Sequence, residues 1–149
     1  MTLKEEVYHH YLNLVNEKIE MLQKSLDDLR DSSANETKST AGDKHETALA
    51  MLQIEQANVG TQLETAREQK SELLKINPLT VNDKIRLGSL ISTDAVYFFI
   101  CTALGKAIIS GKTVFALSLN SPLGIKMSGK SIGESVELQN KHYRILKCE

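Results

Sequence analysis

The sequence lacks tryptophan, and all aromatic residues together make up only 5% of its 149 residues. So few aromatic rings argue against an aromatic-lined pocket for prolyl peptides. No apolar run approaches the roughly 18 residues that a membrane-spanning helix needs, and the first ten residues contain no apolar stretch typical of a signal peptide. We therefore expect a cytoplasmic protein without a membrane partner.

Cysteine is also scarce, with only Cys101 and Cys148 in the chain. Neither lies in a Cys-x-x-Cys pattern or in a Cys/His spacing typical of a zinc site. Because Cys101 follows the apolar run 95–100, its thiol is predicted to be buried and free. This use of cysteine is typical of a reducing compartment.

The chain is too short for large catalytic architectures such as a triose-isomerase-type barrel or a two-lobed kinase. Its net charge of −1 also lacks the basic excess of a free-standing nucleic-acid-binding domain. This average conceals a division, because residues 1–76 carry 14 acidic and 9 basic side chains, whereas residues 77–149 carry 5 and 9. The two parts are therefore expected to face different partners, or each other.

The first half of the chain contains no proline and only two glycines, Gly42 and Gly60. Its apolar residues recur at alternating spacings of four and three, which is the heptad pattern of a coiled coil. The two predicted seams are Tyr8, Leu12, Val15, Ile19, Leu22, Leu26, Leu29 and His45, Leu49, Leu52, Gln56, Val59, Leu63, Ala66, Lys70, Leu73. Because the polar segment 31–42 favours a chain reversal, we expect an antiparallel hairpin of helices at about 3–31 and 43–75.

Both prolines and most glycines lie after residue 77, where Pro78 disfavours further helix. Six β-rich segments follow and predict a small, mostly antiparallel sheet: 85–91, 95–104, 106–109, 113–119, 135–138 and 142–147. Ser121, Pro122 and Gly129 suit the cap, first position and C′ position of one short helix. The predicted fold class is α+β, with an antiparallel coiled-coil hairpin over 1–77 and a β domain over 78–149.

The segment with most chemical content is Gly-Asp-Lys-His-Glu-Thr-Ala, residues 42–48, where the second helix is expected to begin. Asp43 and Glu46 are three residues apart, so their carboxylates would lie on one side of that helix. Acidic residues also suit the first turn of any helix, and a capping role accounts for them equally well. As a functional pair they would offer two oxygen ligands to Mg²⁺, too few for a complete site, so a host would supply the rest.

Two stretches of the sequence resemble the Gre family of bacterial transcript-cleavage factors. Residues 42–48 are similar to the family's tip motif, Gly-Asp-Leu-x-Glu-Asn-Ala, and the match places Asp43 and Glu46 on its two functional acids. Residues 121–138 resemble its C-terminal signature of Ser-Pro-Leu, Gly-Lys and Gly-Asp-x-Val. The resemblance implies a coiled-coil hairpin followed by an FKBP-like β domain.

The resemblance also implies a function. A protein of this family binds RNA polymerase, inserts its coiled coil in the secondary channel and touches nascent RNA only indirectly. It is not an enzyme and has no cofactor of its own, because its tip acids, here Asp43 and Glu46, assist Mg²⁺ shared with the polymerase active site that cuts backtracked RNA. The signature residues carried over as partner-binding are Ser121, Pro122, Leu123, Gly129 and Lys130.

Other functions stay open from the sequence alone. Lys44, Thr47 and Ala50 depart from the family pattern, which favours, as an alternative, a regulator that occupies the secondary channel without stimulating cleavage. A coiled-coil adaptor or a chaperone-like binding module is an alternative from another class, because heptads alone are sufficient for it.

Overall fold

The computed structural model describes residues 1–37 and 42–149, apart from the side chains of residues 36–45. Contacts divide the chain into two compact units. Residues Leu14–Lys70 form one unit, here called the arm. Residues Met1–Asn13 and Ser71–Glu149 form the other, here called the sheet unit.

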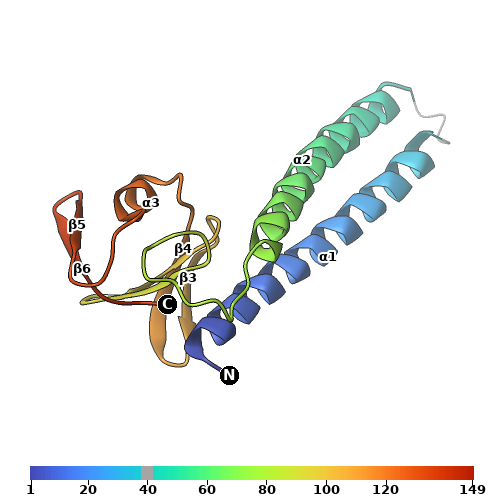
Figure 1. The fold of residues 1–149 in the computed structure, drawn as a ribbon. Coiled ribbons are helices and arrows are strands. Elements are labelled where there is room, and N and C mark those ends of the chain that lie inside the picture. Colours follow the sequence, from blue (N-terminus) through green and yellow to red (C-terminus); the bar gives the residue numbers. More distant parts are fainter. Residues whose placement is uncertain (38–41) are drawn as a thin grey trace. The chain divides into compact units, whose positions relative to one another are not determined.

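The arm consists of most of two long helices, α1 (Leu3–Thr37) and α2 (Gly42–Leu74), which lie side by side (Figure 1). The predicted heptad seam is confirmed, because apolar side chains from both helices form one buried cluster. Its buried members are Leu22, Leu26, Val59, Leu63 and Ala66, with Ile19 and Leu29 packed against them. The one polar seam position described in the middle of α2, Gln56, donates its amide hydrogens to Leu29 O (3.4 Å) and to the Ser33 hydroxyl on α1. The polar residue thus joins the two helices instead of interrupting their contact.

Helix α1 is longer than the sequence predicts. Residues 31–37, expected in the polar connection, continue the helix to Thr37, and α2 begins at Gly42. The predicted connection 31–42 is therefore wrong for its first seven residues. The physical reason is that Asp31, Ser32 and Ser33 favour caps without forbidding helix, and the next strong helix breaker is Gly42.

Six strands form one sheet in the order β3-β4-β2-β1-β6-β5. The strands are β1 (Leu90–Thr93), β2 (Tyr97–Ile100), β3 (Gly105–Ile109), β4 (Lys112–Leu117), β5 (Ser135–Leu138) and β6 (Lys141–Cys148). Four neighbouring pairs are antiparallel and one, β2 with β4, is parallel. The α+β fold class with a mostly antiparallel sheet is therefore confirmed, and the FKBP-like description stays a prediction.

Two tight turns set the register at the ends of the sheet. Ser110 and Gly111 between β3 and β4 both have positive φ, as do Gln139 and Asn140 between β5 and β6, which is the pattern of type I′ hairpin turns. The first strand begins at Leu90 and not at residue 85, because Gly88 adopts φ 89° in a turn that ends the preceding segment.

The sheet is covered on both faces within the sheet unit. A cluster that includes Phe98, Ile100, Ile145 and Met127 packs the helix α3 (Pro122–Met127) against one face. On the other face, the first turns of α1 place Tyr11 parallel to Phe99, with ring centroids 6.3 Å apart. The buried core therefore depends on residues from the two ends of the sequence.

Tyr11 links α1 to the sheet through its hydroxyl group. The side chain is fully buried, and its hydroxyl group donates to the carbonyl oxygens of Gly105 and Val114, which lie 2.9 Å and 3.3 Å from the hydroxyl oxygen. Replacing Tyr11 by Phe keeps the ring and removes the donor, so we expect a loss of about 1–2 kcal/mol in the free energy of unfolding. Urea unfolding of both proteins at pH 7 measures the difference.

The Tyr11 difference is also expected to depend on pH. Burial raises the pKa of Tyr11 to about 12 from its ordinary 10.0. Between these values the unfolded phenol ionises while the folded one stays neutral, so the wild type loses stability as the pH rises. Tyr11→Phe has no phenol at this position and is spared this loss. The difference in the free energy of unfolding between the two proteins should therefore narrow above pH 10. A gap that widens there would contradict the assignment.

The prediction of a buried, free Cys101 is confirmed, and Cys148 is buried and free as well. Burial raises the pKa of the Cys101 thiol to about 12, so almost none of it is thiolate at pH 8. We expect an aromatic disulfide reagent to label neither native cysteine at pH 8 and both in urea. Exposed Ser135, changed to Cys, is the matched control that should react at once.

Candidate functional site

The two acids singled out by the sequence lie in the first turn of α2. This helix begins at Gly42, five residues after α1 ends at Thr37, so Asp43 and Glu46 are at the end of the arm where the chain reverses. Glu46 is exposed, whereas the side chain of Asp43 lies outside the described part of the structure. A helix advances about 1.5 Å per residue and turns 100°, so residues three apart lie on nearly the same side. The backbone of the helix thus places positions 43 and 46 on one side of the arm's end.

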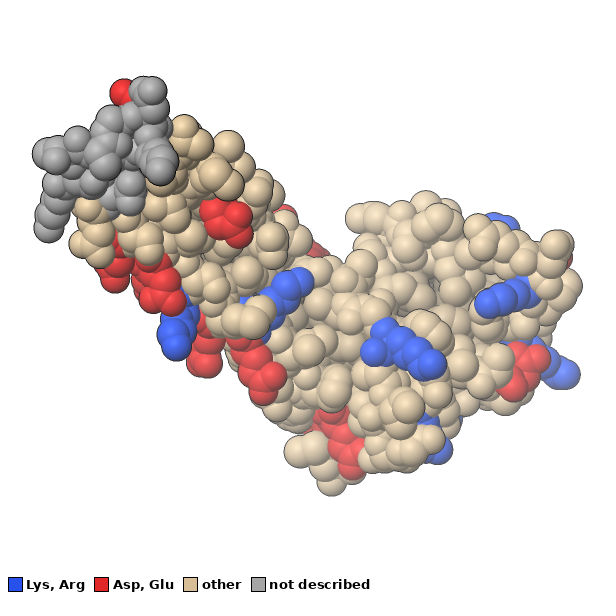
Figure 2. Space-filling view, turned by 180° about the vertical axis from the view of Figure 1, so that it is seen from behind, with Lys and Arg blue, Asp and Glu red and all other residues tan. Residues whose placement is uncertain are grey.

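The rest of the arm is acidic as well. Its residues carry 11 acidic and 7 basic side chains, and acidic groups follow its surface in Figure 2. The exposed acids are Glu17, Glu20, Asp27, Asp28, Asp31, Glu46, Glu55, Glu64 and Glu68. Such a surface favours an environment of cations or basic residues over free nucleic acid.

Metal ligands are few in the described residues. No group of three or more His, Cys, Asp or Glu side chains converges there in a way that could hold a metal ion. Asp43 and Glu46 offer carboxylate oxygens, which are the ligands that Mg²⁺ prefers. Two carboxylates are too few to hold such a cation by themselves.

The signature residues form one continuous cap, helix and turn in the sheet unit. Ser121 is the N-cap of α3, and its hydroxyl oxygen accepts a hydrogen bond from Gly124 N at 3.0 Å. Pro122 occupies the first turn, and Gly129 has φ 77° just after the helix, as the sequence predicts. The sequence therefore predicted the local structure of this segment in detail.

Leu123 and Lys130 belong to the same segment and have different surroundings. Leu123 is half-buried and packs against the core of the sheet unit. Lys130 is half-buried, and its backbone oxygen accepts a hydrogen bond from Ile85 N at 2.8 Å. Pro122 and Gly129 are exposed. All five signature residues are thus brought together, and their role toward a partner stays a prediction.

Gly124 is a structural residue that the motif analysis did not single out. A Cβ atom at this position would lie 2.0 Å from Ser118 O and 2.9 Å from Leu119 Cα. Only glycine allows the backbone of α3 to approach the preceding segment this closely. The glycine directly after Ser-Pro-Leu was the available signal, because an isolated glycine within a short helix often marks a close contact.

Comparisons with known proteins give one result of note. No family model matches the chain, and no curated protein sequence matches it. Among solved structures, one described as "Structure of the transcription factor Gfh1" is similar over 92% of each chain, with 14% sequence identity and a TM-score of 0.35. Within the described residues, no helix combines the length and apolar character needed to cross a membrane.

Proposed function

We propose that this protein is a Gre-like transcription elongation factor that binds RNA polymerase through the secondary channel. The observation that carries the proposal is the acidic arm, whose second helix has Asp43 and an exposed Glu46 in its first turn, at the point of chain reversal. At 1.5 Å per residue the 33-residue α2 is about 50 Å long, which is a reach suited to a deep channel. The motif resemblance at residues 42–48 and 121–138 supports the same function.

In this proposal the arm delivers the acids and the polymerase performs the chemistry. Asp43 and Glu46 would contribute carboxylate oxygens to Mg²⁺ that the polymerase active site also holds. Mg²⁺ in such a site activates water and stabilises the charge that develops when a phosphodiester is cut. The seam between α1 and α2 keeps the acids in place, because its buried cluster and the Gln56 hydrogen bonds hold the two helices together.

The sheet unit would bind the outer surface of the polymerase. It carries 11 basic and 8 acidic side chains, the opposite balance to that of the arm. The segment 121–130 offers a partner a rigid backbone, because Ser121 caps α3 and Gly129 N donates to Ile85 O at 2.9 Å. A preorganised segment loses little entropy on binding.

A non-cleaving regulator of the same polymerase is the second candidate. The observation that favours it is the tip sequence, where Lys44 follows Asp43 and Thr47 follows Glu46. A neighbouring ammonium group would compete with Mg²⁺ for the carboxylates. Such a protein would occupy and block the secondary channel, and no new RNA ends would form.

Stalled elongation complexes of the cognate polymerase test the proposal. We expect the wild-type protein to bind them and to shorten 3′-labelled, backtracked RNA in the presence of Mg²⁺. Binding with altered pausing and no shortened RNA would assign the regulator function. Absence of binding would contradict both, and light scattering would then test an adaptor, whose seam should form dimers.

A further inference from the structure

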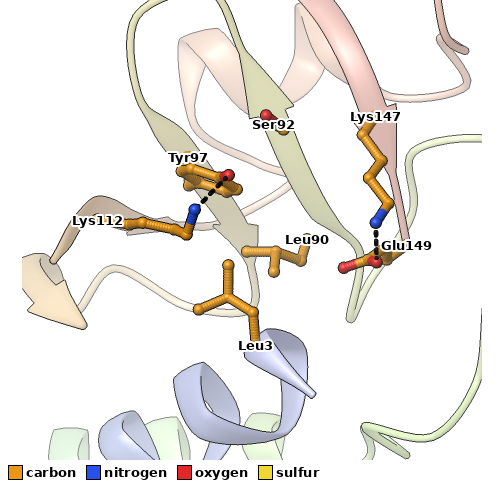
Figure 3. A pocket seen from close by; sticks show the side chains of 7 residues that line it. All are labelled: Leu3, Leu90, Ser92, Tyr97, Lys112, Lys147 and Glu149. Atoms are coloured by element: carbon orange, nitrogen blue, oxygen red, sulfur yellow. Dashed lines mark hydrogen bonds and ion pairs between the residues drawn. The ribbon is translucent and has the colours of Figure 1, made fainter. Parts of the chain in front are cut away.

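The sheet unit contains a pocket of about 280 Å³ that neither candidate function uses (Figure 3). It opens where the first turn of α1 meets one face of the sheet. Its lining side chains are Leu3, Leu90, Ser92, Tyr97, Lys112, Lys147 and Glu149. In Figure 3 the pair Tyr97 and Lys112 and the pair Lys147 and Glu149 lie on either side of the two leucines.

The sheet register brings the polar groups of this pocket together. Ser92 on β1 is paired with Tyr97 on β2 and with Lys147 on β6. Lys112 stands two residues before Val114, the partner of Tyr97 on β4. Because side chains of paired strands align in rows, donors from four neighbouring strands line one side of the pocket. The pairing of the strands therefore determines which side chains stand in this row.

The lysine at one end of the row has no carboxylate partner. Lys112 Nζ lies 3.3 Å from the Tyr97 hydroxyl and 5.2 Å from the centre of its ring, and no carboxylate is within ion-pair distance of it in the described residues. A hydrogen bond from Ser92 and the nearby Lys112 lower the pKa of Tyr97. The same donors that favour a phenolate oxygen would favour an anionic oxygen of a ligand.

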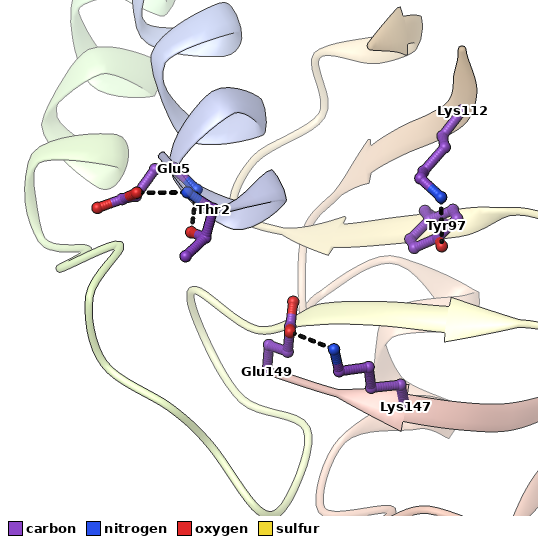
Figure 4. Close-up of polar contacts among 6 residues, drawn as sticks. All are labelled: Thr2, Glu5, Tyr97, Lys112, Lys147 and Glu149. Carbon is purple, nitrogen blue, oxygen red and sulfur yellow. Dashed lines mark hydrogen bonds and ion pairs between the residues drawn. The ribbon is translucent and has the colours of Figure 1, made fainter. Parts of the chain in front are cut away.

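The other end of the row is partly neutralised. Lys147 Nζ is 2.7 Å from a Glu149 carboxylate oxygen, and this contact raises the pKa of Lys147. Figure 4 shows this pair together with the start of α1, where Thr2 N donates to Glu5 at 2.6 Å and Glu5 N donates to Thr2 at 3.2 Å. These two amides already have partners, and the side-chain donors that line the pocket are those of the lysines, the tyrosine and the serine.

We propose that this pocket binds a small organic carboxylate. Its anionic head would lie near Lys112, Tyr97 and Ser92, and its apolar body would contact Leu3 and Leu90. Lys147 is paired with Glu149, so Lys112 supplies the single unpaired positive charge among the lining side chains, which matches a carboxylate better than a phosphate monoester with its charge of about −1.5 to −2. This site is separate from the surfaces used in the polymerase proposal, since neither the arm nor the segment 121–130 contributes a lining residue.

Benzoate is the probe, and benzamide is its neutral counterpart of nearly equal shape. We expect benzoate to shift backbone amide signals of Ser92, Tyr97 and Lys112 in ¹H–¹⁵N spectra of the full-length protein, with saturation. Hydrogen bonds to a charged group are stronger than those to a neutral group, and partial exposure reduces the difference, so benzamide should bind at least about fivefold more weakly. Phenyl phosphate should bind no more tightly than benzoate.

Three variants separate a built site from general attraction to lysines. Lys112→Met should weaken benzoate about fivefold, and Glu149→Gln should tighten it about threefold, because a competing carboxylate is removed. Lys106→Met removes an exposed lysine outside the pocket and should change nothing. Thermal unfolding of each variant checks that it is folded.

Several results would overturn the proposal. They are equal binding of benzamide and benzoate, tighter binding of phenyl phosphate, shifts that never saturate, or equal effects of Lys112→Met and Lys106→Met. The expected pattern requires both the negative charge of the ligand and the position of one lysine.

Discussion

Replacing Asp43 and Glu46 together by alanine is expected to lower stimulated RNA cleavage by roughly 100-fold, because the proposed mechanism assigns both carboxylates to Mg²⁺ and both are lost at once. Binding to the polymerase should change little, since neither acid belongs to the helix seam or to the sheet unit. The measurement is the rate of shortening of 3′-labelled RNA in stalled complexes, at fixed Mg²⁺ and saturating factor.

The control for this variant removes the same number of negative charges at another place on the same helix. Glu64→Ala/Glu68→Ala removes two exposed acids from α2, far along the chain from its first turn. It should leave the cleavage rate within about twofold of wild type, because salt screens exposed charges this far from the first turn of α2. If both double variants cleaved like wild type, the borrowed-metal mechanism would be wrong even though the partner could stand. If both failed equally, the effect would be one of overall charge.

Raising Mg²⁺ gives a second test of the same acids. If one carboxylate is lost, as in Glu46→Ala, the remaining ligands hold the metal more weakly, so more Mg²⁺ should restore part of the rate. A variant that lost the shape of the arm would gain nothing from added Mg²⁺. The comparison separates a ligand role from a structural one, such as the capping role that first-turn acids also perform.

Much of the fold could be predicted because its signals are local. Heptad spacing places Leu22, Leu26 and Leu63 on one seam, and the structure buries all three. The ends of α3 are set by the local preferences of Ser121, Pro122 and Gly129. In both cases a short stretch of sequence is sufficient to specify the geometry.

The parts that could not be predicted depend on contacts between distant residues or on weak signals. The pocket joins Lys112 to Lys147 through the register of four strands, which no spacing in the sequence reveals. The cap-forming residues in 31–37 predict an end of α1 that is too early. The helix continues through them because the stretch contains neither proline nor glycine. Positions 43 and 46 both lie in the first turn of α2, and the role of these two acids stays a prediction because it depends on a partner.

Gly124→Ala is expected to have the largest effect on stability of any single methyl addition in the described part of the chain. The new Cβ would meet the backbone atoms Ser118 O and Leu119 Cα, which cannot move aside as a flexible side chain could. Overpacking of this kind costs about 3 kcal/mol, or roughly 10 °C in the melting temperature of a chain of this size. Near-UV circular dichroism on heating measures it.

The matched control adds the same methyl group where space is open. A Cβ at Gly60, inside α2, would meet no atom within 4 Å, and alanine favours helix over glycine by about 0.8–1 kcal/mol. Gly60→Ala should therefore stabilise the arm, the opposite sign to Gly124→Ala. Displacement of α3 also disturbs the segment 121–130, so Gly124→Ala should weaken polymerase binding while Gly60→Ala leaves it intact. Equal binding by both would remove this segment from the proposed interface.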